Sequence, residues 1–216
     1  MTVKAASLRQ PEFLRATVFW ALRKLTGFQV HDVFAISLSH HWDSDKTNHA
    51  HRFSSCKNDR NNRLLDPLIE GQLNNHSGPS CKELLDREFD VYYALDDRTV
   101  AVQLNMLHGQ IIVDSPIDLQ LCLGPRVAFL NYLYTHPEYR GRGLARSLMA
   151  YACSDQQRQG MQSCLAHVRS TNYSSQRVFG KAGWKRQGKI VTRRGGLTTT
   201  HGCGSAGLAV KSLQSA

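Results

Sequence analysis

Apolar residues recur along this chain in two rhythms, one with the period of a helix and one with that of a strand. Over residues 11–25, leucine and valine positions are spaced by four, four and three residues, which predicts an amphipathic helix. Residues 30–38 are rich in β-branched and aromatic side chains and predict a strand. Residues 39–62 are mostly polar, so we expect a long loop or a poorly ordered excursion there.

The remainder of the chain alternates between strand and helix patterns. Helices are predicted over residues 64–73, 80–89, 144–159 and 174–182, and strands over residues 90–94, 99–107, 110–113, 119–123, 126–135, 162–168, 184–191 and 208–213. The order shows neither an internal repeat nor a domain boundary. We therefore expect one α/β (α+β) domain over residues 1–216, built around a mixed sheet and interrupted by the polar insertion around residues 39–63.

Composition and charge narrow the functional classes. Hydrophobic residues make up 41% of the 216 residues and charged residues 20%, which is ordinary for a globular domain and excludes a disordered chain. Lys and Arg number 27 against 17 Asp and Glu, a formal net charge of +10. This excess favours anionic partners such as phosphorylated cofactors, nucleic acid or acidic surfaces, with plain solubility as an equal alternative.

Cysteine usage and hydropathy bear on the cellular environment. The six cysteines are scattered without a CxxC spacing, which favours reduced thiols in a cytoplasmic protein over a disulfide scaffold or a zinc module. His49, His51 and Cys56 lack the paired spacing of a structural zinc site, so no metal is expected. Apolar runs stay well short of the roughly 20 residues of a membrane-spanning helix, and we expect no membrane contact.

The strongest chemical signal is the six-residue segment from Arg140 to Ala145, RGRGLA, which lies between a predicted strand and a predicted helix. The first turn of a helix leaves backbone N–H groups without partners, and glycine lets a ligand approach them closely. With the positive end of the helix dipole, these groups form an anion site that suits a diphosphate. Arg140, Arg142 and Arg146 add positive charge at the same place.

Three other interpretations of this segment are weaker. An ordinary surface turn would explain the glycines alone, but not the arginines between a strand and an amphipathic helix. A Rossmann turn needs glycine at the sixth position of GxGxxG, where this chain has Arg146. A P-loop needs a closing GK[ST], which the segment lacks.

Two linked motifs resemble the GNAT superfamily of acyl-CoA-dependent N-acyltransferases. The first is Arg or Gln, two residues, Gly, one residue, and Gly or Ala; here these positions are Arg140, Gly143 and Ala145. The second is Asn, a small residue, an apolar-aromatic pair, and Gly with an aromatic residue, matched here by Asn172, Ser175, Val178, Phe179, Gly183 and Trp184. The resemblance implies a twisted, mixed and mostly antiparallel sheet flanked by helices, with a splayed central pair of strands.

The resemblance also implies the site and its co-substrate, acetyl-CoA. The strands ending near residues 135 and 168 would splay apart and admit the pantetheine arm, held by backbone groups of Leu133 and Thr135. The Leu133 N–H would polarise the thioester carbonyl. Asn172 would order the cofactor or a water near the sulfur, and Phe179 would contact the cofactor. The diphosphate would be held by Arg140, Gly141, Arg142, Gly143, Leu144 and Ala145.

The chemistry implied by the resemblance is direct attack of a neutral amine on the thioester, without a covalent enzyme intermediate. Many family members carry a tyrosine where this chain has Phe179, and its hydroxyl protonates the departing thiolate. Tyr173 is the nearby alternative in this chain. The others are protonation by water or another residue, departure without side-chain protonation, and weak or lost activity.

The general base is left open by the sequence. The strand predicted over residues 126–135 contains no carboxylate, although Asn131, Tyr132 and Tyr134 could position a water there. His167 and Asp90 are further candidates. A packing or surface role is the simpler expectation for each of these residues.

Three functions follow: an N-acetyltransferase acting on a primary amine, a catalytically weak or inactive module that binds CoA, and an acetyltransferase with an acceptor associated with nucleic acid, such as tRNA or a ribosomal protein. The last rests on net charge alone, since the sequence offers no basic stripe interleaved with aromatic residues. The HHxxxD pattern at residues 40–45 belongs to much larger, two-lobed acyltransferases and is a chance match. The sequence does not determine the acceptor or the oligomeric state, for which a homodimer is one expectation.

Overall fold

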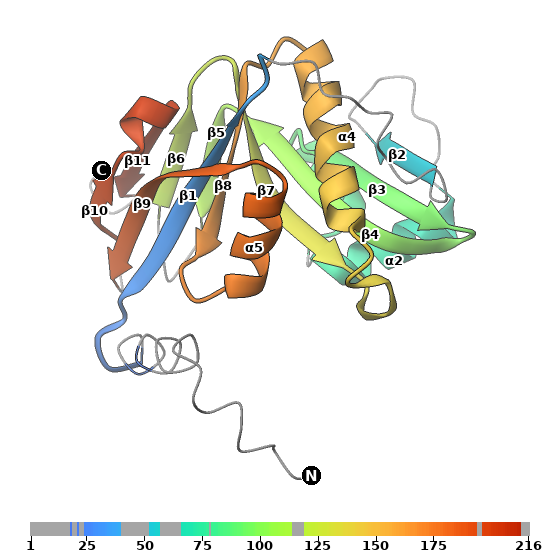
Figure 1. The fold of residues 1–216 in the computed structure, drawn as a ribbon, viewed down its shortest axis with the longest axis horizontal. Coiled ribbons are helices and arrows are strands. Elements are labelled where there is room, and N and C mark those ends of the chain that lie inside the picture. Colours follow the sequence, from blue (N-terminus) through green and yellow to red (C-terminus); the bar gives the residue numbers. More distant parts are fainter. Residues whose placement is uncertain are drawn as a thin grey trace.

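The computed structural model describes residues 18, 21, 24–39, 52–56, 66–77, 79–113, 119–193 and 196–212. The helix predicted over residues 11–25 lies largely outside these residues, as do residues 40–45, His49, His51 and much of the polar segment. In the described part, strands and helices follow one another along the chain and build a large mixed sheet with helices packed against it (Figure 1).

The larger sheet has eight strands in the order β10-β9-β1-β8-β7-β4-β3-β2. Neighbouring strands pair antiparallel, with the exception of the central pair β7 and β8, which is parallel. The strands are β1 (Gln29–Ser37), β2 (Arg52–Cys56), β3 (Asp90–Asp96), β4 (Thr99–His108), β7 (Val127–Thr135), β8 (Ser163–Arg169), β9 (Lys185–Arg193) and β10 (Gly196–His201).

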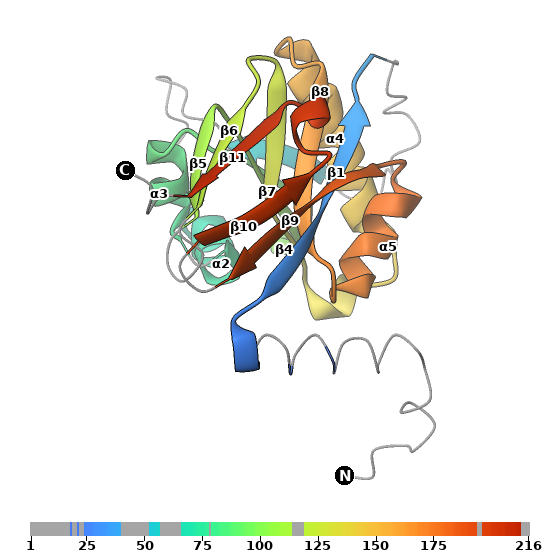
Figure 2. The same cartoon turned by 90° about the vertical axis from the view of Figure 1, so that its left-hand side faces the viewer.

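Helices α4 (Leu144–Arg158) and α5 (Tyr173–Lys181) cover one face of this sheet. The other face is covered by α2 (Pro67–Ser77), α3 (Cys81–Asp86) and a smaller antiparallel sheet in the order β11-β6-β5 (Figure 2). The remaining elements are β5 (Gln110–Val113), β6 (Leu119–Leu123), β11 (Leu208–Ser212) and the 3-10 helices η3 (Pro137–Tyr139) and η4 (Gly204–Ala206). Each face has its own buried cluster, with Leu148 and Leu104 in one and Leu73 and Leu165 in the other.

The parallel strands β7 and β8 pair over only part of their length. Their paired residues end at Leu130 opposite Ala166. Beyond that point β7 continues to Thr135 and pairs with β4 alone. The β4–β7 ladder shifts register there because Asn131 is an extra, bulged residue, and a bulge bends and twists its strand. The sheet therefore opens between β7 and β8, which confirms the splayed central pair of strands.

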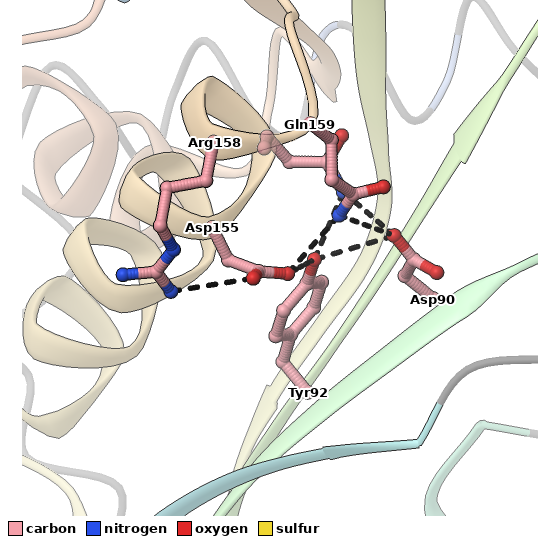
Figure 3. Close-up of polar contacts among 6 residues, drawn as sticks. Asp90, Tyr92, Asp155, Arg158 and Gln159 are labelled. Atoms are coloured by element: carbon pink, nitrogen blue, oxygen red, sulfur yellow. Dashed lines mark hydrogen bonds and ion pairs between the residues drawn. The ribbon is translucent and has the colours of Figure 1, made fainter. Parts of the chain in front are cut away.

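The C-terminal end of α4 is tied to the sheet by buried polar side chains (Figure 3). The Tyr92 hydroxyl donates a hydrogen bond of 2.7 Å to Asp155 Oδ2. Gln156 Nε2 donates to Asp90 Oδ2 at 2.7 Å and to the Tyr92 oxygen at 2.9 Å. Burial raises the pKa of Tyr92, with the Asp90 charge adding to the effect, so the phenol stays protonated and can donate. Asp155 lies roughly 16 Å along the helix from Leu144.

Two strands of the structure were missed by the sequence prediction. Arg52–Cys56 lies within the segment predicted as a loop, but it forms strand β2 on the edge of the sheet and pairs with β3. This short strand depends on its partner and on the stacking of Phe53 against Tyr151, with ring centroids 5.6 Å apart, which the local sequence does not reveal. Strand β10 (Gly196–His201) was not predicted, although its three consecutive threonines are β-branched and favour a strand.

Candidate functional site

A cleft of about 690 Å³ lies beside the end of β7, where β7 and β8 part. Its walls come from the end of β7 with the turn that follows, from the first turn of α4, and from one side of α5. The lining residues are Leu133, Tyr134, Thr135, Tyr139, Arg140, Gly141, Gly143, Leu144, Ala145, Arg146, Ser174, Ser175, Val178 and Lys181. Arg142, Asn172 and Phe179 were predicted to bind the cofactor and are not among them; the other residues predicted to bind the cofactor are.

The start of α4 presents unpaired amides to this cleft. Gly141 and Gly143 have φ angles of 79° and 81°, a left-handed conformation that glycine adopts without the steric cost of a side chain. Gly143 is the N-cap residue and supplies no side chain to cap the helix. Within the described part of the chain, the amides of residues 141–145 donate no backbone hydrogen bond. These N–H groups and the helix dipole make the turn an anion site.

Cations surround the same turn. Arg140, Arg146 and Lys181 line the cleft, and their side chains are exposed, while no carboxylate is among the lining residues. Arg140 Nε donates to the Thr135 carbonyl at 3.2 Å, which braces the turn against the end of β7. Arg142 instead lies over the Tyr139 ring, with its guanidinium carbon 5.1 Å from the ring centroid. The cleft is therefore suited to a ligand with several negative charges.

Asn172 has a structural role that accounts for its side chain. It is the N-cap of α5, and its Oδ1 accepts hydrogen bonds from the Ser175 amide at 3.2 Å and the Ser174 hydroxyl at 2.9 Å. Asn is among the residues that cap helices best. The residue thus shapes the start of α5, whose next residues form one wall of the cleft.

The two aromatic residues predicted near the reacting sulfur lie elsewhere. Phe179 is 3% exposed and sits in the core beneath α5, with ring centroids 5.5 Å from Phe34 and 5.0 Å from Trp184. Tyr173 lines a separate hollow of about 370 Å³ together with Phe34 and Arg186. Tyr173 and Phe179 lie on other faces of α5 than the residues that line the cleft, because successive residues of a helix point about 100° apart.

Of the residues considered as general base or water ligand, only Tyr134 lines the cleft. His167 is half-buried, and desolvation of its ring lowers its pKa to about 4. Asp90 belongs to the network that anchors the far end of α4. Tyr132 is half-buried, which raises its pKa, and Asn131 is the exposed bulge residue of β7.

A model of the Acetyltransferase (GNAT) family matches residues 83–184 of the chain, which span the cleft and both motifs. This segment is a GNAT acetyltransferase domain. Members of this family use acetyl-CoA as acyl donor. No curated protein sequence matches the chain.

Solved structures agree with this assignment of the fold. A structure from Novosphingobium aromaticivorans DSM 12444 assigned to the GNAT family shares 17% identity with a TM-score of 0.50, covering 79% of this chain and 66% of that chain. A GNAT-family acetyltransferase from Colwellia psychrerythraea shares 11% identity with a TM-score of 0.53, covering 77% of this chain and 56% of that chain. The chain thus spans less than two thirds of the length of either protein, and at these identities the likeness concerns the fold.

Three cleft residues of the GNAT domain went unnoticed in the sequence: Tyr139, Ser174 and Lys181. Tyr139 ends the 3-10 turn η3, just before the glycine-rich turn. Ser174, Val178 and Lys181 are spaced by four and three residues, which places them on one face of α5. That spacing was a usable signal, because the motif residue Val178 lies in the middle of it.

Two further observations on the described residues concern membrane-spanning helices and metal sites. None of their helices is both long and apolar enough to cross a membrane. They also contain no group of three or more His, Cys, Asp or Glu side chains arranged to hold a metal ion.

Proposed function

We propose that the GNAT domain binds acetyl-CoA in the cleft beside β7 and transfers the acetyl group to a primary amine. The observation that carries this proposal is the row of unpaired amides at residues 141–145, at the mouth of a cleft that begins where β7 and β8 part. A diphosphate on these amides would place the pantetheine arm along the open edge of β7. The cations Arg140, Arg146 and Lys181 would offset its charge.

The reacting end would lie deeper, at the open edge of β7. In that position the Leu133 N–H would donate to the thioester carbonyl, whose oxygen gains negative charge as the amine attacks. The neutral amine would add to the carbonyl carbon directly, so no side-chain nucleophile is required. This accords with the lining residues, which include serines and threonine but no cysteine, histidine or carboxylate.

Calorimetry with acetyl-CoA tests the binding half of the proposal. The wild type should bind saturably, and the double variant Arg140→Glu/Arg146→Glu should bind at least about tenfold more weakly, since two charge-assisted contacts are reversed. Lys185→Glu makes the same kind of charge change at an exposed residue outside the cleft and should bind like the wild type. A wild type that shows no binding at millimolar acetyl-CoA would end the proposal.

Thiol release from acetyl-CoA in the presence of a panel of primary amines tests the catalytic half. The second candidate is a CoA-binding module without turnover. It is favoured by Phe179, which has no hydroxyl to donate a proton and is packed in the core. Saturable binding without thiol release for any amine would decide for that candidate. Amine-dependent release above the hydrolysis rate would decide for the transferase.

A further inference from the structure

The formal net charge of +10 belongs to one part of the chain. Residues 156–216 contain ten Lys and Arg and no Asp or Glu, whereas residues 1–155 contain 17 cationic and 17 acidic side chains. A surface that only keeps a protein soluble mixes the two signs. Separation of charge between two parts of a chain instead indicates a polyanionic partner, such as nucleic acid or an anionic membrane.

Three of these cations project from β9 on the side of the sheet that carries α5. In the β1–β9 ladder Arg186 lies opposite Phe34, and Lys189 lies opposite Asp32. Directly opposite residues of paired strands share a face, and Phe34 belongs to the cluster under α4 and α5. Arg193 follows Lys189 by four residues and therefore projects to the same side.

A fourth cation reaches the same surface from α5. Arg177 lines the hollow beside α5 together with Arg186. Strands β9 and β10 lie at the edge of the larger sheet, beyond α5 (Figure 1). Arg177, Arg186, Lys189 and Arg193 are all exposed, and we call these four residues the basic face. None of them lines the cleft, which other residues of α5 border.

The carboxylate at this surface lies beneath the cations. Asp32 is 3% exposed, its Oδ1 lies 3.7 Å from Arg186 Nη1, and its Oδ2 accepts a hydrogen bond from Gln176 Nε2 at 3.4 Å. The Arg186 side chain is nevertheless 60% exposed. Asp32 thus holds Arg186 from below, while the guanidinium stays accessible to a ligand.

Two aromatic rings accompany the cations. The Arg193 guanidinium carbon lies 5.6 Å from the centroid of the Phe28 ring, and Tyr173 lines the hollow with Arg177 and Arg186. Nucleobases stack on aromatic rings and on guanidinium planes, while Arg and Lys contact phosphates. An acidic peptide or a lipid headgroup would use the cations but not the rings. The combination therefore favours a single-stranded nucleic acid, whose bases are free to stack.

We propose that the basic face binds single-stranded nucleic acid, with phosphates on its four cations and a base stacked on Tyr173. The surface is separate from the cleft, so the proposal does not depend on acetyl transfer. Aromatic side chains on the surface of a sheet are a recurrent means of holding the bases of single-stranded RNA. Each neutralised phosphate releases counterions, so the affinity falls as salt is added.

Fluorescence anisotropy of the full chain with a fluorescein-labelled oligouridylate of about 16 nucleotides tests the proposal. Four phosphate contacts give a slope of about −3 for log K against log salt, since single strands contribute roughly −0.7 per contact. Lys189→Gln/Arg193→Gln should halve this slope and weaken binding at least about tenfold at low salt. Tyr173→Leu keeps the charge, so it should weaken binding at least about fivefold without changing the slope.

The matched control is Arg52→Gln/Arg87→Gln, which makes the same change of charge elsewhere. Arg52 lies on β2 at the other edge of the sheet, and Arg87 ends α3 on the other face; both are exposed. This pair should bind the oligouridylate like the wild type. Equal urea unfolding midpoints for both double variants and the wild type show that a loss of binding is not a loss of fold.

Several results would overturn the proposal. They are no saturable binding by the wild type at low salt, an unchanged slope in Lys189→Gln/Arg193→Gln, and an equal loss in the control pair. Equal or tighter binding of poly-L-glutamate of the same length would assign the face to an acidic protein, and of phosphatidylserine vesicles to a membrane surface. Wild-type binding by Tyr173→Leu, or equal binding of a duplex of the same length, would exclude the stacked base.

Discussion

Tyr92 of β3 and Asp155 of α4 are joined by a hydrogen bond of 2.7 Å, from the phenol to the carboxylate Oδ2. The second carboxylate oxygen accepts from Arg158 at 3.3 Å. The tyrosine side chain is fully buried, and Gln156 donates to its oxygen from the same helix. The helix whose first turn forms the anion site is therefore held at its other end by a buried polar network, in addition to its apolar face.

Tyr92→Phe should destabilise the protein by about 1–3 kcal/mol, because it leaves the half-buried Asp155 carboxylate and the buried Gln156 amide each without one partner. Denaturant unfolding measures this loss. Tyr151→Phe removes the hydroxyl of a neighbouring ring, whose centroid lies 6.2 Å from that of Tyr92, and should lower the stability less. The acetyl-CoA affinity of Tyr92→Phe should equal that of the wild type, and a large change would mean that the anchor and the cleft are coupled.

The glycine turn offers a matched pair of substitutions. Gly141 and Gly160 have similar φ angles, 79° and 89°, and a β-carbon at either would meet nothing within 4 Å. Gly141→Ala and Gly160→Ala should therefore lose a similar stability, roughly 1–2 kcal/mol, from backbone strain alone. Only Gly141 lies at the cleft, so only its variant should weaken acetyl-CoA binding, by about tenfold if one strong amide contact is lost. Equal binding by the two variants would argue against an anion on this turn.

A substitution of Lys181 tests whether α5 contributes to acetyl-CoA binding in the cleft. Its ammonium is exposed, so its contribution should be modest, and Lys181→Ala should raise the Kd for acetyl-CoA about two- to fivefold. The difference from wild type should narrow as salt is added, because ions screen exposed charges. Calorimetry at two salt concentrations measures both effects. Lys185→Ala, four residues on and outside the cleft, is the control and should change neither.

His167 should make stability depend on pH below neutrality. Burial, with Arg169 nearby, lowers its pKa to about 4 in the folded protein, against about 6.5 in an unfolded chain. Between these values the unfolded chain binds a proton that the folded protein does not, so stability is fully present above about pH 6.5 and is lost as pH falls towards 4. The total loss from this group is roughly 3 kcal/mol.

Urea unfolding between pH 4.5 and 7.5 measures this dependence. His167→Gln has no ionisable ring, so its stability curve should be flatter over the same range. Parallel curves for the wild type and the variant would show that His167 does not titrate in this way.

Much of the fold could be predicted because its elements have local signatures. The hairpin of β3 and β4 combines two apolar runs with a polar turn at residues 96–98. Strand β2 has no such signature, and its place on the sheet edge depends on β3. The pairing of β11 with β6 in a separate sheet was also beyond local reasoning, since strand pairing joins residues far apart in the chain.

The candidate site, too, could be predicted only in part from the sequence. The turn from Arg140 to Ala145 was recognisable because anion binding there uses backbone amides, glycines and a helix start that are contiguous in sequence. The predicted roles of Asn172 and Phe179 came from a motif, and the structure shows the first capping a helix and the second packed in the core. The sequence of β7 carries both Tyr132 and Tyr134 and does not show that only Tyr134 lines the cleft.

The sequence by itself determined the elements around the cleft, the anion turn and the family resemblance, because helix starts, glycine conformations and apolar periods act over a few residues. Only the tertiary structure decided which side chains share the cleft. A bulge at Asn131 and the end of the β7–β8 pairing at Leu130 open the sheet, and the face of α5 that meets this opening selects Val178 over Phe179. Those outcomes depend on how strands and helices pack against one another, and no short stretch of sequence contains that information.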